Sequence, residues 1–196
     1  MHKLRDYISV LIVLIILFAF TGCKQKDFTA DYTTYYNMKD AVRSSNLIIK
    51  GQIKNVERNK SIVIGQSSGM SQKYAVSDVE ILDVIYGEAN IGDTIQIKQM
   101  ENEKTTKEAG YLEKDQIVIL LLQTYASTPA SLINPAQGKM VFIDNILTVT
   151  MEDDLYRILS NSNQDNQEST TTNISNTPIT YPYETVISII KGSIES

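Results

Sequence analysis

The chain of 196 residues contains one histidine, one cysteine and no tryptophan. His2 and Cys23 lie in or beside an apolar N-terminal run that we expect to be removed in part. Removal of residues 1–22 would leave 174 residues with no histidine and with the cysteine in first place. A histidine base, a Cys-His pair, a disulfide and a Cys/His zinc site are excluded for such a chain.

Basic residues are the minority, and the formal net charge is −5. Loss of residues 1–22 takes away Lys3, Arg5 and Asp6, which changes the net charge to −6. An acidic surface repels phosphate backbones, so we expect no nucleic acid as a partner. The hydrophobic fraction of 42% is sufficient for a core, and the length suits one domain.

The N-terminus has the three parts of a secretory signal. Residues 1–6 carry Lys3 and Arg5, residues 7–20 are almost wholly apolar, and the small residues Thr21 and Gly22 precede Cys23. The apolar run of about 14 residues is shorter than the roughly 20 residues that a membrane-spanning helix needs. The pattern therefore predicts export.

The segment Phe20-Thr21-Gly22-Cys23 resembles the lipobox of bacterial lipoproteins, although that family usually has leucine where Phe20 stands. The resemblance implies cleavage between Gly22 and Cys23 and attachment of a diacylglyceryl group to the Cys23 sulfur. It predicts a lipid anchor on the outer face of the cell membrane, with the membrane as a partner. The alternative is an uncleaved membrane anchor that happens to contain a cysteine.

Apolar patterns predict a set of short strands. Residues 47–56 alternate between apolar and polar side chains, and residues 117–122 are continuously apolar, which is typical of a strand buried on both faces. Residues 73–86 break the alternation near 77–78 and 82–83, which predicts two β-bulges and a bent strand. The expected fold class is mainly β, a small antiparallel barrel of bent strands.

Helices are expected on both sides of this barrel. A helix over residues 35–44 could be capped by Thr33 or Thr34, a second opens at Glu152-Asp153-Asp154, and an amphipathic helix closes the chain. The predicted divisions are a signal peptide at 1–22, a tether at 23–33, the barrel with flanking helices at 34–159, a polar loop at 160–182 and a C-terminal helix at 183–196.

The order of these signals carries a second resemblance, over about residues 35–150. The segments concerned are Ser45–Ile53, Tyr74–Gly87, Gly92–Ile97, Tyr111–Leu122 and Asn134–Gly138. The pattern resembles uncharacterised surface lipoproteins of Gram-positive bacteria and, more distantly, the netrin-like barrel of metalloproteinase inhibitors. That barrel has the oligonucleotide/oligosaccharide-binding (OB) topology. The inhibitors act through a free N-terminal cysteine amine and use disulfides, so their activity is not expected here.

Three polar features are candidate sites. Asp78 and Glu80 share one strand face and could act as a catalytic carboxylate pair, or could form an exposed strand face. Glu152-Asp153-Asp154 could bind a hard cation, or could serve the N-terminus of a helix. The loop Asn134–Gly138 could bind a ligand at the barrel rim, or could simply build a turn.

Tyrosine is the abundant aromatic residue, and ten of the 11 tyrosines lie beyond residue 22. Tyr32, Tyr35 and Tyr36 cluster near the tether, and Tyr181 and Tyr183 lie beside the last helix. Such residues stack on ligands and partner proteins, or seal the ends of a barrel.

The sequence therefore predicts a lipid-anchored extracytoplasmic binding or interaction protein with no catalytic activity, no metal and no cofactor. Its partner would be an envelope protein or a glycan. The alternatives are a carboxylate-dependent enzyme acting on envelope polymers, and an accessory or immunity-type lipoprotein with a membrane partner.

Overall fold

Strands dominate the computed structural model, as predicted. It describes residues 32–64, 70–101, 106, 109–150, 153–163 and 178–196. The elements in chain order are α2 (Met38–Arg43), β1 (Leu47–Ile64), β2 (Met70–Tyr86), β3 (Thr94–Met100), β4 (Ile117–Gln123), β5 (Ala130–Leu132), β6 (Lys139–Ile143), β7 (Ile146–Val149), α4 (Asp154–Asn163), β8 (Ile179–Pro182) and α5 (Tyr183–Glu195).

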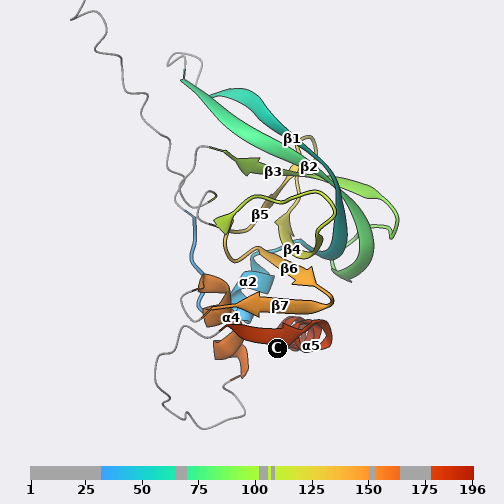
Figure 1. Ribbon diagram of the computed structural model, residues 1–196, viewed down its shortest axis with the longest axis vertical. Coiled ribbons are helices and arrows are strands. Elements are labelled where there is room, and N and C mark those ends of the chain that lie inside the picture. The colour runs from blue at the N-terminus through green and yellow to red at the C-terminus, as the bar shows by residue number, and fades with distance from the viewer. Residues whose placement is uncertain (1–31, 65–69, 102–105, 107–108, 151–152, 164–177) are drawn as a thin grey trace, which may run out of the picture.

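Five of the strands close into a barrel (Figure 1). The sheet order is β1-β2-β3-β5-β4-β6-β7-β8, and an additional pairing of β1 with β4 closes a ring through the first five. The barrel is antiparallel, as predicted, except at one pair, because β3 and β5 run parallel. A ring with an odd number of strands cannot alternate in direction throughout, so at least one pair must be parallel.

Irregular pairing bends the long β1–β2 hairpin around the barrel. Leu82 is an extra residue on β2, which confirms the bulge predicted there. The second predicted bulge lies on the opposite strand, because the residue left over beside Ser77-Asp78 is Lys54 of β1. Gly51 lies in the same hairpin, and a Cβ at that position would collide with the Val79 side chain, so the close approach of the two strands requires glycine.

The central strand β4 is buried on both faces, as its continuous apolar run predicted. Val118, Leu120 and Leu122 belong to the barrel core, whereas Ile119 and Leu121 belong to a second core outside it. The barrel core is formed by Leu47, Ile49, Ile53, Val79, Ile81, Ile97, Leu112, Val118, Leu120, Leu122, Ala130 and Leu132. One strand thus joins the two halves of the molecule.

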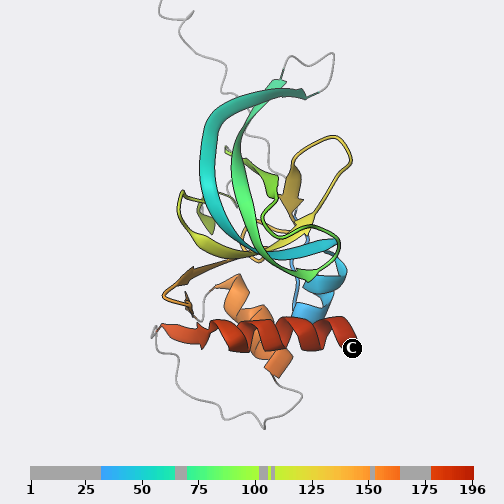
Figure 2. The same ribbon diagram turned by 90° about the vertical axis from the view of Figure 1, so that its right-hand side faces the viewer.

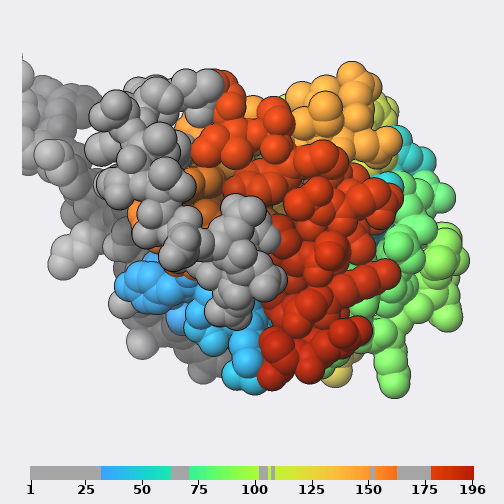
Figure 3. All heavy atoms as spheres, turned by 90° about the horizontal axis from the view of Figure 1, so that it is seen from below, coloured from blue at the N-terminus to red at the C-terminus, as the bar shows by residue number. Residues whose placement is uncertain are grey.

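The second core lies between the outer face of the sheet and the helices. Figure 2 shows α2, α4 and α5 gathered at one end of the barrel, and Figure 3 shows α5 crossing this end beside α2. The buried residues of α5 are Val186, Ile187 and Ile190, which confirms the amphipathic C-terminal helix. The hairpin β6–β7 turns at Asp144 and Asn145, whose φ angles of 50° and 62° suit a tight two-residue turn.

The first helix is shorter than predicted. It begins at Met38, and the cap is Asn37, whose side chain accepts a hydrogen bond from the backbone N–H of Asp40. Neither Thr33 nor Thr34 is the cap, because the helix begins four or five residues later and the Thr33 carbonyl accepts from Asn134 of another loop.

The expected polar loop at 160–182 is also partly wrong. Helix α4 continues to Asn163, where the Ser162 hydroxyl accepts from the backbone N–H of Met38. Strand β8 pairs with β7 at the end of the sheet. Its residues Ile179 and Tyr181 pack against the second core, which we also call the helical core. Residues 164–177 lie outside the described residues. Tertiary contacts, which local composition does not report, order both ends of this segment.

Candidate functional site

A cavity of about 330 Å³ lies over the outer face of β3, β5 and β4. Its floor follows from strand register, because Ser131 of β5 pairs with Lys98 of β3 on one side and with Gln123 of β4 on the other. Directly paired residues point to the same face of a sheet. The three polar side chains therefore form one row across the sheet, which we call the polar row.

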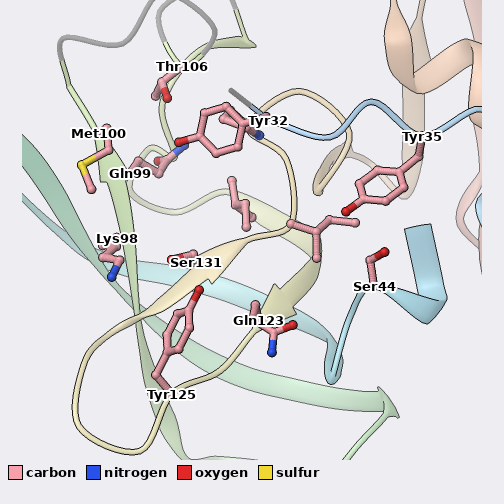
Figure 4. Close-up of a pocket in the computed structure, with 13 residues that line it drawn as sticks. Tyr32, Tyr35, Ser44, Lys98, Gln99, Met100, Thr106, Gln123, Tyr125 and Ser131 are labelled. Carbon is pink, nitrogen blue, oxygen red and sulfur yellow. The ribbon is translucent and has the colours of Figure 1, made fainter. Parts of the chain in front are cut away.

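Tyrosines stand around the polar row. Figure 4 shows Ser131 between the ring of Tyr32 and the ring of Tyr125, with Tyr35 on a third side. Tyr125 belongs to the loop after β4 and is 49% exposed. The Lys98 Nζ atom lies 5.1 Å from the centre of the Tyr125 ring, a cation–π distance that holds the ammonium group at the cavity.

Gln99 adds a buried polar group to the cavity lining. Its side chain is 5% exposed, and its Oε1 atom accepts from the backbone N–H of Leu112 at 2.9 Å. Its Nε2 atom has no hydrogen-bond partner among the described residues. A buried donor left unpaired costs about 1–3 kcal/mol.

The loop Asn134–Gly138 holds the segment that leads into the cavity. The Gln137 amide pairs with the backbone of Tyr35 twice, since Nε2 donates to the carbonyl at 2.8 Å and Oε1 accepts from the N–H at 2.9 Å. Asn134 Nδ2 donates to the carbonyl of Thr33 at 3.0 Å. This pair of amides, which we call the amide clamp, binds the chain's own backbone.

The amide clamp decides between the two interpretations of this loop. Gln137 is fully buried and Asn134 is 4% exposed, so both side chains are used inside the protein. Their effect on the site is indirect, because they fix Tyr35, and with it the start of the described chain, at the wall of the cavity.

A second, more open hollow of about 430 Å³ lies beside the first. It is lined by residues 94–96 of β3 and by residues 124–130, which connect β4 to β5. Tyr125 lines both hollows, so this loop separates two parts of one polar surface.

Asp78 and Glu80 lie on the outer face of β2, as their spacing predicted, and both are engaged in structural contacts. The Asp78 carboxylate accepts from Asn55 at 3.2 Å and from Gln96 at 2.9 Å. Glu80 forms a salt bridge of 2.8 Å with Lys54. Neither residue lines either of the two hollows described above.

The acidic group before α4 contributes to local structure. Asp153 accepts from the backbone N–H of Thr150, and Asp154 forms a salt bridge of 3.2 Å with Arg157. Glu152 lies outside the described residues. No group of three or more candidate metal ligands occurs within the part of the chain that the structure describes.

The predicted tyrosines have different roles. Tyr32 and Tyr35 line the cavity, whereas Tyr36 is 65% exposed. Tyr181 and Tyr183 pack against the helical core, and burial raises the pKa of both phenols. The Tyr183 ring meets Phe142 edge-on at 5.5 Å.

The polar row leaves no local signal in the sequence because its members come from three strands. Gln99, a further residue of the cavity lining, does leave one, since it follows Ile95 and Ile97 at the same alternate positions of β3. A polar residue at such a position points to a buried hydrogen bond or to a ligand.

Lys139, a buried lysine, was also missed. It is 8% exposed and its Nζ atom donates to the carbonyl of Gly110 at 2.5 Å. Burial lowers the pKa of Lys139 to about 8, against the opposing attraction of Glu113.

The lowered pKa of Lys139 makes stability depend on pH. Between the folded pKa near 8 and the ordinary value of 10.5, the unfolded chain binds more protons, so stability rises with pH. We expect the free energy of unfolding to rise by about 2 kcal/mol from about pH 7 to about pH 9.5. Urea titrations should show a smaller rise in Lys139→Met than in wild type or in Lys191→Met, an exposed control. Equal rises in all three would contradict the assignment.

The comparisons leave the family open: no protein-family model matches the chain, and no curated protein matches it. The predicted cleavage and lipid-attachment residues, Gly22 and Cys23, lie outside the described residues. Within the described ranges, no helix has the length and apolar character needed to cross a membrane.

Proposed function

We propose that this protein is a lipid-anchored extracytoplasmic binding protein whose ligand occupies the cavity over the polar row. The observation that carries the binding role is the polar row in the cavity, whose Lys98, Ser131 and Gln123 side chains hydrogen-bond to no other described residue. The volume of about 330 Å³ is within the range of small-ligand sites. The anchor rests on the lipobox-like segment that ends at Cys23.

The proposal puts the cavity near the membrane. Nine residues, 24–32, separate Cys23 from Thr33, whose carbonyl the amide clamp holds. Even fully extended, the connection between Cys23 and Thr33 reaches at most about 35 Å. A ligand at the cavity would therefore be captured close to the outer face of the cell membrane.

The alternatives have less support. A carboxylate-dependent enzyme would need Asp78 and Glu80 to face a substrate, and these side chains are engaged by Asn55, Gln96 and Lys54. A role as an accessory or immunity-type lipoprotein has no observation of its own in its favour. Both functions stay untested predictions.

The binding role can be tested by nuclear magnetic resonance on the processed chain in detergent micelles. A panel of small envelope fragments, neutral and charged sugars and dipeptides, should include a compound that shifts the amide signals of the polar row saturably. Ser131→Trp, which fills the cavity, should abolish these shifts, whereas Ser71→Trp on an exposed part of β2 should not. The proposal fails if no compound shifts the polar row, or if Ser131→Trp leaves the shifts unchanged.

A further inference from the structure

The charge of the cavity lining is opposite to that of the whole chain. The net charge is −5, yet Lys98 is the charged residue in the lining, and no described aspartate or glutamate lines the cavity. Lys98 forms no salt bridge with another described residue, and its ammonium group lies over the Tyr125 ring. A positive charge is thus held at the cavity without an anionic partner from the described parts of the chain.

The polar groups beside Lys98 are also unused. Neither the Ser131 hydroxyl nor the Gln123 amide hydrogen-bonds to another described residue, and the same is true of Gln99 Nε2. A comparable row on β1, β2 and β3 behaves differently, because its members Asn55, Asp78 and Gln96 bind one another. Unused polar groups are therefore a property of the cavity and do not recur in that neighbouring row.

The unused groups offer more hydrogen-bond donors than acceptors, so they need a ligand that accepts. A lysine ammonium group and an amide NH₂ can only donate, whereas a hydroxyl can do both. A carboxylate only accepts and has two oxygens to offer. One lysine balances one negative charge, so a carboxylate fits this lining better than a phosphate dianion does.

Resting on the proposed function, we infer that the cavity binds a small organic monoanion, a carboxylate attached to a ring. The carboxylate accepts from Lys98 Nζ and from the Ser131 hydroxyl, which are neighbours in the polar row. The ring lies against the exposed face of Tyr125, whose apolar surface and hydroxyl suit a sugar-sized group. This names the ligand class that the binding role leaves open.

Three compounds with the same ring separate the possible charges. N-acetylmuramic acid has one carboxylate, N-acetylglucosamine is neutral, and N-acetylglucosamine 6-phosphate is close to a dianion. Each is titrated into the processed chain in detergent micelles, with the amide signals of Lys98, Gln99 and Ser131 as the readout. We expect N-acetylmuramic acid to bind at least about tenfold more tightly than the other two, which corresponds to one charge-assisted hydrogen bond.

Lys98→Met should weaken binding of N-acetylmuramic acid about tenfold, because methionine has neither the positive charge that attracts the carboxylate nor an N–H that donates to it. Lys191→Met removes the same charge from an exposed position of α5 and should leave the affinity unchanged. Ser131→Ala removes the second donor to the carboxylate and should also weaken binding.

Failure of this inference differs from failure of the binding role. Binding of the neutral sugar or the phosphate as tightly as the carboxylate, or unchanged affinity in Lys98→Met, would overturn the anion assignment and leave the cavity a binding site. If none of the three compounds shifts the cavity signals, the anion assignment falls. The wider panel of sugars and dipeptides then decides whether the binding role falls with it.

Discussion

Cys23→Ala should reduce incorporation of a labelled fatty acid to background and should remove the protein from its normal membrane fraction. The reason is chemical, because the diacylglyceryl group is attached through a thioether and alanine has no sulfur. Two or three acyl chains hold a protein at a membrane far more firmly than one chain, so loss of the attachment point has a large effect. The measurement is metabolic labelling in a bacterial host, followed by fractionation.

Thr29→Ala, in the predicted tether, is the matched control and should be labelled like the wild type. Unchanged labelling of Cys23→Ala would contradict the lipid anchor. Labelling that disappears while the chain stays in the membrane fraction would favour the alternative, in which the N-terminal apolar run itself anchors the protein.

Gln137→Leu should lower the free energy of unfolding by about 2–4 kcal/mol. The leucine side chain is of similar size but leaves both the N–H and the carbonyl of Tyr35 without the partners that Gln137 supplies. Each unpaired buried group costs about 1–3 kcal/mol. Urea unfolding measures the change, with an unchanged dependence on denaturant showing that the compactness of the two states is preserved.

Gln52→Leu is the control for Gln137→Leu, because Gln52 is only partly buried and its amide oxygen meets the exposed Lys54. Its effect should stay within about 0.5 kcal/mol. Hydrogen exchange adds a local readout, since the Tyr35 N–H should lose its protection in Gln137→Leu. A destabilisation below about 0.5 kcal/mol, or full protection of Tyr35, would show that the amide clamp does not hold the N-terminal segment.

Predictions that rest on one segment of chain agree well with the structure. The apolar run of β4 is buried on both faces, residues 47–53 have their alternate apolar side chains in the barrel core, and the last helix is amphipathic. In each case, the side-chain pattern of a single element decides which face is buried.

Predictions failed where distant segments decide the structure. Strand β5 has only three residues and is stabilised by pairing with both β3 and β4. The amide clamp joins Gln137 to Tyr35 across 102 positions in the chain. The loop Asn134–Gly138 was noticed, but its partner could not be identified from its own residues.

By itself, the sequence determined that the described chain folds mainly as strands, with one central strand buried on both faces and an amphipathic helix at its end. Side-chain periodicity within an element is sufficient for that, because burial of apolar surface selects one face of a strand or helix. The tertiary structure alone decided that an odd ring of strands closes through the parallel pair β3–β5. The same closure aligns Lys98, Ser131 and Gln123, which makes the cavity a product of strand register.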